Sequence, residues 1–283
     1  MEENKTNMKE IEKLFAAGSH LGHKKNRLHP KARKYVYKIV NGVAVIDLTK
    51  TAVQLAEAKK YLAELAKDGK QLLVVGTKRV ASQYIQELCK EKGLSYITTK
   101  WMPGLLTNFE TLSKNIKKMN DLETQKGDGT WEQYVKHERT KMNKHLNRLK
   151  RLYSGIADMK RRPDALFIVD IKREKNALKE AKQNKIQVVA ITDTNTNPDT
   201  VDYPVVANDD SPTSSQYVIE SILSAFTTSP KAPAGEKKET AKAEMKKEDK
   251  KEEPKAEDKK AEVKEKKPKR TTKKVVKKET KKE

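Results

Sequence analysis

The side chains best placed to do chemistry form a run of cations near the start of the chain. Between Leu14 and Ile46 there is no aspartate or glutamate, and we call this stretch the cationic strip. Its lysines and arginines include Lys24, Lys25, Arg27, Lys31, Arg33, Lys34 and Lys38. Like charges repel one another unless a partner neutralises them, and a polyphosphate does so with release of condensed counterions. The strip therefore predicts contact with a nucleic-acid backbone.

Three of the five histidines, His20, His23 and His29, also lie in the cationic strip. Their spacing invites comparison with zinc sites, but no cysteine or carboxylate stands nearby in the sequence to complete a set of ligands. Imidazole rings, and the ring of Tyr37, can instead stack on unpaired bases or hydrogen-bond to them. We therefore expect polar or RNA contacts from these histidines, and no metal.

Two aspartates offer a competing chemistry. Asp170 and Asp193 each follow a predicted strand, and carboxylates at strand ends can hold magnesium or act as an acid–base pair. However, aspartate at such positions commonly caps the next turn or helix. Gly76-Thr77-Lys78 resembles part of a phosphate-binding loop but lacks the spacing of a complete one. An enzyme using Asp170 and Asp193 remains the alternative to a non-catalytic binding protein.

The charge balance of the whole chain favours an anionic partner. The 283 residues carry a formal net charge of +22. Residues 231–283 hold 22 basic and 13 acidic side chains, so most of the excess positive charge lies outside this last part. Lysines outnumber arginines by 52 to 10, which favours contact with phosphates over reading of base edges. We therefore expect RNA or DNA as the partner and no small-molecule substrate.

Cysteine content and hydrophobic runs bear on the compartment. The single cysteine, Cys89, leaves no intramolecular disulfide to form and is typical of a reducing compartment. No apolar run approaches the roughly 20 residues that span a bilayer. The first ten residues, MEENKTNMKE, are too polar and acidic for a signal peptide. We therefore expect a soluble cytoplasmic protein without a membrane contact.

Apolar runs alternate with helical patterns along residues 43–226, and these elements must position the candidate residues. We expect strands at residues 43–48, 72–75, 165–169 and 188–191, with weaker candidates at 96–98 and 205–206. We expect helices at residues 51–67, 79–92, 172–184 and 213–226. This alternation predicts an α/β fold with a mostly parallel sheet and helices on both faces. Asn41-Gly42 predicts a hairpin turn between the apolar runs on either side of it.

Residues 107–159 interrupt this alternation. They contain no predicted strand, only two amphipathic helical stretches on either side of KGDGT at residues 126–130. We expect these stretches to form a protruding antiparallel coiled-coil hairpin. Its polar face carries Lys114, Lys117, Lys118, Lys136, Arg139, Lys141, Lys144, Arg148, Lys150 and Arg151. A solvated face is the ordinary explanation for such charges, but the bias to one sign favours contact with nucleic acid.

The last part of the sequence differs in composition from the rest. Residues 231–283 contain no Leu, Ile, Phe, Tyr or Trp, so they cannot bury enough apolar surface to offset chain entropy. We expect a domain at residues 1–228, with the helical hairpin inserted at 107–159, and a disordered tail at 229–283. The nearly acid-free sequence KKPKRTTKKVVKK in this tail is either a loose phosphate-binding arm or part of a solubilising segment.

Five stretches of the sequence form a specific pattern when taken together. They are AAGSHLGHKKNRLHPKARKYVYKIVNGVAVIDLTKT (16–51), VVGTKRVA (74–81), KWMPGLLTNFETL (100–112), RRPDALFIVDIKREKNALKEA (161–181) and VVAITDTNTNPDTVDYPVVANDDS (188–211). In order and spacing, they resemble the bacterial small-subunit ribosomal protein S2 family. The resemblance extends over residues 8–226 and does not include the tail.

The resemblance implies a fold and a role. The fold is a flavodoxin-like α/β domain bearing a protruding coiled-coil hairpin, and the role is structural and non-enzymatic, in the small (30S) ribosomal subunit. It implies 16S rRNA and neighbouring small-subunit proteins as partners, including protein S1, which docks on this family and supports mRNA capture in translation. No cofactor is implied. Together with the charges, it leads us to expect rRNA contacts at Lys24, Lys25, Arg27, His29, Lys31, Arg33, Lys34, Lys78, Arg79, Lys100, Arg148 and Arg151.

Overall fold

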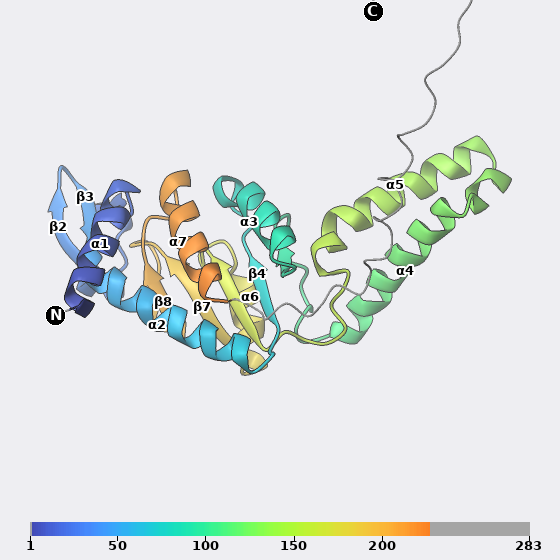
Figure 1. Cartoon of the computed structure of the whole chain (residues 1–283). Coiled ribbons are helices and arrows are strands. Elements are labelled where there is room, and N and C mark those ends of the chain that lie inside the picture. The colour runs from blue at the N-terminus through green and yellow to red at the C-terminus, as the bar shows by residue number, and fades with distance from the viewer. Residues whose placement is uncertain (1, 227–283) are drawn as a thin grey trace, which may run out of the picture. The chain divides into compact units, whose positions relative to one another are not determined.

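Five parallel strands form the main sheet (Figure 1). The computed structural model describes residues 2–226, with side chains described from residue 8 onward. The strands are β4 (Leu72–Val75), β5 (Ser95–Ile97), β6 (Ala165–Val169), β7 (Gln187–Thr192) and β8 (Tyr203–Val206). Their order across the sheet is β5-β4-β6-β7-β8, and each neighbouring pair is parallel. This is the strand order of flavodoxin-like folds.

Helices cover both faces of this sheet, and the sheet separates two apolar cores. Successive residues of a strand point to opposite faces, so Val74 of β4 packs in one core and Leu73 in the other. The first core lies against α1 (Glu2–Ala16), α2 (Leu48–Lys67), α3 (Arg79–Glu91) and α7 (Pro212–Ala225). The second lies against α6 (Lys175–Gln183) and two further helices described below. The predicted mostly parallel sheet with helices on both faces is confirmed.

A second sheet, of three antiparallel strands, carries much of the cationic strip. Its strands β1 (Leu21–Lys24) and β2 (Val36–Val40) pair on either side of β3 (Val43–Ile46). Asn41 and Gly42 take positive φ angles of 51° and 77° between β2 and β3, so the predicted hairpin turn is confirmed. Two short 3-10 helices, η1 (Lys25–Arg27) and η2 (Pro30–Tyr35), connect β1 to β2.

The strand expected at residues 43–48 is shorter than predicted. β3 ends at Ile46, and the carboxylate of Asp47 accepts a hydrogen bond from the backbone N–H of Thr49 at 3.1 Å. This side chain caps α2, so Leu48 is the first residue of a helix that we expected to begin at Thr51. An aspartate just before a helix is a common N-cap, and this signal places the boundary better than hydrophobicity does.

Two long helices fill the interval without strands. α4 (Phe109–Gly127) and α5 (Lys136–Tyr153) are joined by a turn that contains the 3-10 helix η3 (Thr130–Gln133). Lys126 donates to Asn143 at 3.0 Å, and Lys150 donates to Glu123 at 2.6 Å, so the two helices run antiparallel. We call α4, η3 and α5 the helical hairpin; its supercoiling stays a prediction. The expected tail at residues 229–283 lies outside the described residues.

An apolar seam holds the helical hairpin together. Its buried side chains are Phe109, Leu112, Ile116 and Met119 on α4, Trp131 on η3, and Leu146, Leu149 and Tyr153 on α5. They recur at the three- and four-residue spacing that places side chains on one face of a helix. They are continuous with the second core of the main sheet.

Among the described helices, none is long and apolar enough to cross a membrane.

Candidate nucleic-acid interface

The cations of the strip face outward from the short elements that flank the small sheet. The exposed ones are Lys24, Lys25, Arg27, Lys31, Arg33, Lys34 and Lys38, whereas His29 is half-buried. Ala32 is the buried residue of η2, and its neighbours Lys31 and Arg33 are exposed to solvent. The Nδ1 atom of His29 accepts a hydrogen bond from the backbone N–H of Lys31 at 3.2 Å and caps η2. His29 therefore has a local structural contact in addition to its predicted role.

The strip cations divide into paired and unpaired groups. Lys34 Nζ donates to Asp199 at 2.7 Å, and Lys31 Nζ lies 3.9 Å from the same carboxylate. The hydrogen bond from Lys34 lowers the pKa of Asp199. The strip cations that make no ion pair with any described residue are Lys24, Lys25, Arg27, Arg33 and Lys38. These unpaired charges remain available to an external anion.

His23 ties the small sheet to the loop after β7. Its Nδ1 lies 2.8 Å from the carboxylate of Asp193, which is 1% exposed, and its Nε2 lies 2.8 Å from the amide of Asn195. The backbone N–H of His23 also donates to the hydroxyl of Thr194 at 2.9 Å. The hydrogen bond to Asp193 raises the pKa of His23, while burial opposes it. His23 therefore anchors the platform that carries the strip; the expectation that it contacts an unpaired base is untested.

Lys78 stands between two carboxylates. Its Nζ lies 2.9 Å from Asp209 and 2.6 Å from Asp210, and its side chain is only 13% exposed. Burial, together with the nearby charges of Asp193 and Asp170, raises the pKa of Asp209 to about 7, although Lys78 opposes the shift. The ammonium group is therefore already neutralised within the chain, so a phosphate would have to displace these carboxylates to reach it.

A cation-binding arrangement exists at the same edge of the sheet. His23, Asp193 and Asp210 bring three potential ligand atoms within 4.8 Å of one another, which is close enough for a small divalent ion. However, the ammonium group of Lys78 already forms an ion pair with Asp210 and neutralises this carboxylate. An ion would have to compete with Lys78 for this carboxylate. The residues fit a metal only after such a rearrangement, and no step below depends on one.

The other predicted contact residues lie on the main sheet and the helical hairpin. Arg79 begins α3, Lys100 follows β5, and Arg148 and Arg151 lie on α5; all four are exposed. The hydroxyl of Thr99 donates to the backbone carbonyl of Arg151 at 2.9 Å. This bond brings Lys100 and Arg151 to the same corner of the fold, although 51 residues separate them in the sequence. The structure does not bring this pair together with the cationic strip in one contact.

The two aspartates of the alternative reading both stabilise loops. Asp170 has a positive φ of 67°, and its side chain accepts hydrogen bonds from the backbone N–H groups of Lys172 and Arg173 at 2.9 and 3.3 Å. Asp193 accepts from His23 and from the hydroxyl of Thr194. Both carboxylates are thus used as caps and anchors. No observation places them around a substrate.

The usual ligand position of a flavodoxin-like sheet is filled. It lies at the switch point, where the chain leaves β4 and β6 in opposite directions. There the hydroxyl of Thr77 donates to the carboxylate of Glu174, and both residues are buried. Burial raises the pKa of Glu174, and the bond from Thr77 opposes that rise. At the position where an enzyme of this fold would hold its ligand, these two side chains therefore bond to each other.

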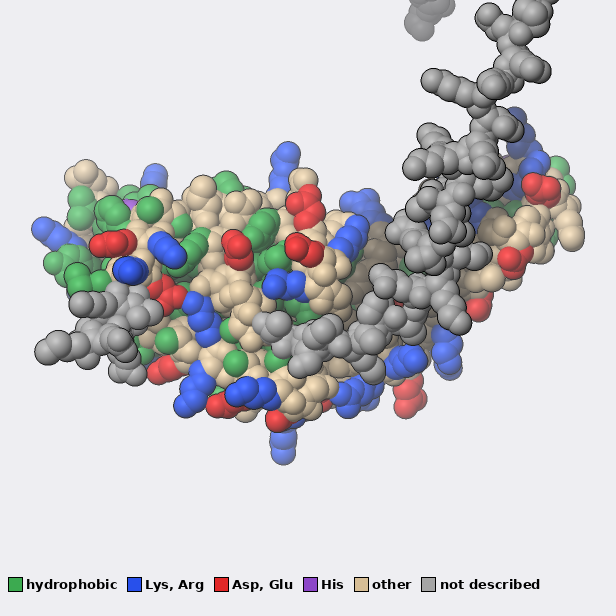
Figure 2. All heavy atoms as spheres, in the orientation of Figure 1, with side chains coloured by type: hydrophobic (Ala, Val, Ile, Leu, Met, Phe, Trp, Pro, Cys, Tyr) green, Lys and Arg blue, Asp and Glu red, His purple; other side chains and the backbone are tan. Residues whose placement is uncertain are grey.

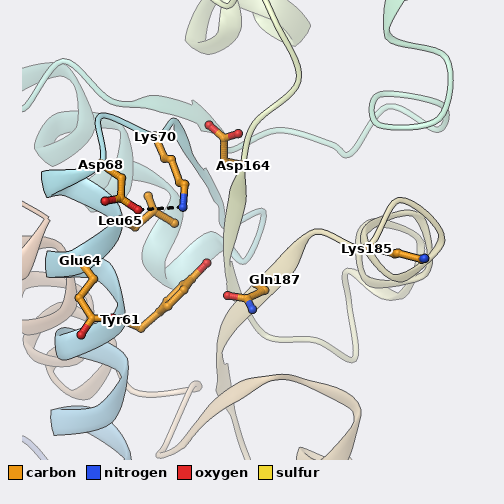
Figure 3. Close-up of a pocket in the computed structure, with 8 residues that line it drawn as sticks. All are labelled: Tyr61, Glu64, Leu65, Asp68, Lys70, Asp164, Lys185 and Gln187. Carbon is orange, nitrogen blue, oxygen red and sulfur yellow. Dashed lines mark hydrogen bonds and ion pairs between the residues drawn. The ribbon is translucent and has the colours of Figure 1, made fainter.

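A cavity of about 370 Å³ lies at the opposite, amino-terminal edge of the sheet (Figure 3). Glu64, Asp68 and Asp164 line it with Lys70, which donates to Asp68 at 2.8 Å. Figure 3 shows Lys185 set apart from the others. Because its charges are mixed and partly paired, this cavity does not have the one-signed character of the cationic strip. It is a poor candidate for binding phosphate.

The sequence of residues 14–229 matches the family model for ribosomal protein S2. The chain belongs to the ribosomal protein S2 family. The matched range begins at the first residue of the cationic strip and contains both sheets and the helical hairpin. Membership makes the chain a ribonucleoprotein component that works in translation in the small ribosomal subunit. The family is structural and non-enzymatic, which disfavours the enzyme reading of Asp170 and Asp193.

Proposed function

We propose that this chain binds 16S rRNA through two sets of exposed cations and acts as a structural constituent of cytoplasmic small ribosomal subunits. One set is the cationic strip, and the other is Arg148 and Arg151 near the end of α5, with Lys100 at the same corner of the fold. Each lysine or arginine that neutralises a phosphate releases counterions, so the two sets supply affinity without reading sequence. Family membership supports the assembly, and the charges support the partner within it.

The observation that carries this proposal is the fixed position of unpaired charge. Lys24, Lys25, Arg27 and Arg33 are exposed and without an ion pair among the described residues, while His23 anchors the elements that bear them. A platform that is already ordered loses less conformational freedom when it binds. The proposed contact residues are Lys24, Lys25, Arg27, His29, Lys31, Arg33, Lys34, Arg79, Lys100, Arg148 and Arg151. We leave out Lys78 because Asp209 and Asp210 hold its ammonium group.

Charge neutralisation on the strip tests the proposal. The variant Arg27→Gln, Lys31→Gln, Arg33→Gln removes three cations, and binding to 30S subunits should lose about 2–3 units from its salt dependence, the slope of log K against log salt. The matched control Lys60→Gln, Lys67→Gln, Lys90→Gln removes the same charge from exposed positions on α2 and α3. Cosedimentation with 30S subunits across a salt series measures both. Equal occupancy by the strip variant and the wild type would reject the strip as the rRNA-binding surface.

We further propose that the outer face of the small sheet docks protein S1, the partner implied by the family resemblance. Strand register places Leu21, Val45 and Lys38 in one row of that face, and Lys24, Val43 and Val40 in the next. Leu21 is 48% exposed and Val40 is 46% exposed. In Figure 2 hydrophobic side chains gather at the end of the molecule where β2 and β3 lie. An apolar face next to an unpaired strand edge is typical of a protein-docking surface.

Polar substitutions on this face separate the two proposals. Leu21→Ser with Val40→Ser should deplete S1 from purified 30S subunits while the chain itself stays on them, because the strip cations are unchanged. Val53→Ser is the control, since Val53 is 53% exposed but lies on α2. Quantitative mass spectrometry of salt-washed subunits gives both occupancies. Normal S1 content in the double variant would place the docking surface elsewhere.

A further inference from the structure

A cavity of about 340 Å³ lies at the turn of the helical hairpin. Its lining comes from the end of α4, from η3 and from the first two turns of α5: Lys126, Trp131, Lys136, Arg139, Thr140 and Asn143. The volume is at the lower end of the range of about 300–1,000 Å³ that is usual for ligand sites. None of these residues belongs to the contact set proposed above, so the cavity raises a separate question.

The charge of this cavity has one sign. Lys126, Lys136 and Arg139 line it, and no carboxylate does. None of the three makes an ion pair with a described residue, whereas Lys150 on the same hairpin pairs with Glu123 at 2.6 Å. The ammonium group of Lys126 donates a hydrogen bond to the amide oxygen of Asn143, which fixes its position at the cavity. Three like charges around one hollow repel each other, and an anion between them would remove that cost.

Trp131 provides a second and independent observation. Its side chain is 6% exposed and lines the cavity, yet its indole N–H donates to no described residue. A buried donor without an acceptor is unfavourable, and buried polar groups in folded proteins are nearly always paired. The indole N–H has no acceptor function, so only a group with a lone pair satisfies it. An anionic oxygen is such a group.

The start of α5 adds to the same field. Lys136 is the first residue of this 18-residue helix, and the N-cap residue Val135 has no side chain that can accept a hydrogen bond. Its carbonyl accepts from the backbone N–H groups of Glu138 and Arg139, which leaves those of Lys136 and His137 without a cap. The N-terminus of a helix carries a partial positive charge and readily binds phosphate. Lys136 and Arg139, at the two ends of this first turn, line the cavity, whereas the acidic residue of the turn, Glu138, does not. Side-chain charge, helix dipole and an unpaired indole thus converge there.

We propose that this cavity binds a phosphate group of the RNA backbone and makes the turn of the helical hairpin a discrete anchoring point. The inference rests on the rRNA-binding function proposed above and gives the hairpin a specific site within it. Lys136 and Arg139 neutralise the phosphate, and Lys126 lies over the indole ring of Trp131, 5.9 Å from its centroid. The indole N–H is covered in the unbound chain, so the cavity must open around the ring before this group can donate to a phosphate oxygen. Phosphate is favoured over a carboxylate because residues 109–153 carry 11 lysines and arginines against six carboxylates, an excess of positive charge suited to a polyphosphate.

The two tryptophans of the chain make a direct test possible, because each gives one indole N–H signal in a ¹⁵N NMR spectrum. The full-length protein is titrated with single-stranded hexauridylate, with inorganic phosphate and, as a third arm, with hexaglutamate. Trp131→Phe identifies the signal of Trp131. We expect hexauridylate to shift this signal strongly and the Trp101 signal little, with inorganic phosphate giving the same shift at higher concentration.

Matched variants of α5 localise the effect. Lys136→Gln with Arg139→Gln should weaken hexauridylate binding, measured by the Trp131 shift, about tenfold or more at low salt. Lys141→Gln with Lys144→Gln removes the same charge from exposed positions of the same helix that do not line the cavity, and should change it less than twofold. Trp131→Phe keeps the apolar seam and removes only the donor. The Trp131→Phe variant should bind labelled hexauridylate several-fold more weakly, as measured by fluorescence anisotropy.

The outcomes separate this inference from the function on which it rests. If the Trp131 signal does not move, or if both double variants lose affinity equally, the cavity is not a phosphate site. If hexaglutamate shifts the signal and hexauridylate does not, the site takes an acidic peptide and the proposal fails. Cosedimentation of the wild type with 30S subunits reports on the broader function independently. Its absence would reject rRNA binding itself, whatever the cavity does.

Discussion

The two cation-bearing regions of this molecule are attached to the main sheet by different chemistry. The small sheet is joined through polar contacts: His23 to Asp193, Lys34 to Asp199, and the backbone N–H of His29 to the carbonyl of Thr194 at 2.9 Å. The helical hairpin is joined largely through the apolar seam that continues into the second core. Polar contacts between titratable groups depend on pH, whereas apolar packing depends on shape.

This difference indicates how each region presents its charge. Around the small sheet, carboxylates of the main sheet neutralise selected cations and leave others free, so charge is sorted between anchoring and binding. The hairpin keeps nearly all of its cations unpaired and relies on packing to stay in place. The small sheet should therefore respond to pH, and the hairpin to steric changes at its root.

The largest expected effect concerns Glu180, which holds the loop leading into the hairpin. This 9% exposed carboxylate accepts hydrogen bonds from the indole N–H of Trp101 at 3.0 Å and from the backbone N–H groups of Gly104 and Leu106 at 2.9 and 3.1 Å. Glu180→Ala leaves three donors unpaired and should lower the free energy of unfolding by about 4 kcal/mol. Urea denaturation measures this.

The neighbouring exposed Lys179 provides the control for that substitution. Lys179→Ala lies on the same helix and should change stability by no more than about 0.5 kcal/mol. If Glu180→Ala proves equally mild, the loop is held by its packing and the three hydrogen bonds contribute little.

A pair of glycines compares the two joins directly. A Cβ on Gly155 would clash with the backbone carbonyl of Tyr96 and lie 2.8 Å from its ring. A Cβ on Gly22 would lie 2.7 Å from the side chain of Thr194 and 3.0 Å from the backbone carbonyl of Ala44, a milder backbone contact. Backbone cannot move aside as a side chain can. We expect Gly155→Ala, at the hairpin root, to cost about 3 kcal/mol, and Gly22→Ala, at the small sheet, about 1 kcal/mol. Thermal unfolding, monitored by circular dichroism, ranks the two variants by their loss of stability. The reverse order would contradict the view that the hairpin root is packed more rigidly than the contact between the small sheet and the main sheet.

The response to pH should distinguish the small sheet. The pKa of His23 is raised by its bond to Asp193, so the stability it provides is complete below the unfolded pKa and is lost as pH rises through the folded pKa. The pKa of Asp209 is raised to about 7 from 3.8, so its proton is also released as pH rises. Both effects make the free energy of unfolding fall between pH 5 and pH 8. Carboxylates with lowered pKa values, Asp47, Asp199 and Asp210, titrate below this window.

Substitution of His23 should remove part of that slope. His23→Gln is expected to cost about 2 kcal/mol at pH 5.5 and less at pH 8, because the lost contact matters most where the imidazole is charged. Denaturation curves at several pH values measure it. His29→Gln is the control, since His29 bonds only to backbone N–H of its own segment through its ring. A wild-type stability that rises from pH 5 to pH 8 would contradict the sign of both shifts.

The sequence patterns predicted the main sheet well because its strands are buried on both faces. β4, β6 and β7 are continuous apolar runs, as parallel strands covered by helices should be. β1 was not predicted, since its sequence LGHK has no alternation of apolar and polar residues. α1 was missed for a related reason: it is largely polar, and among its side chains described from residue 8 onward only Leu14 is fully buried.

The candidate interface was also predictable only in part from the sequence. The cations of the strip could be recognised because their density is a local property of the sequence. Their partners could not, because Asp193 lies 170 residues from His23, and Asp209 lies 131 residues from Lys78. Lys78 was therefore predicted as a phosphate ligand, although the fold supplies it with two carboxylates. The cavity beside Trp131 also escaped notice, because it exists only where α4 and α5 meet.

The smallest expected effect concerns the surface of the hairpin. Lys150 and Glu123 form an ion pair at 2.6 Å between α5 and α4, with side chains 40% and 55% exposed. Because solvent screens such pairs, Glu123→Gln should lower stability by only about 0.5 kcal/mol, and the loss should vanish at high salt. Yet the variant frees one more cation on a face that is already positive, so we expect tighter binding to 30S subunits at low salt. Unchanged binding in cosedimentation would mean that this face does not meet RNA, and that the hairpin acts through its turn alone.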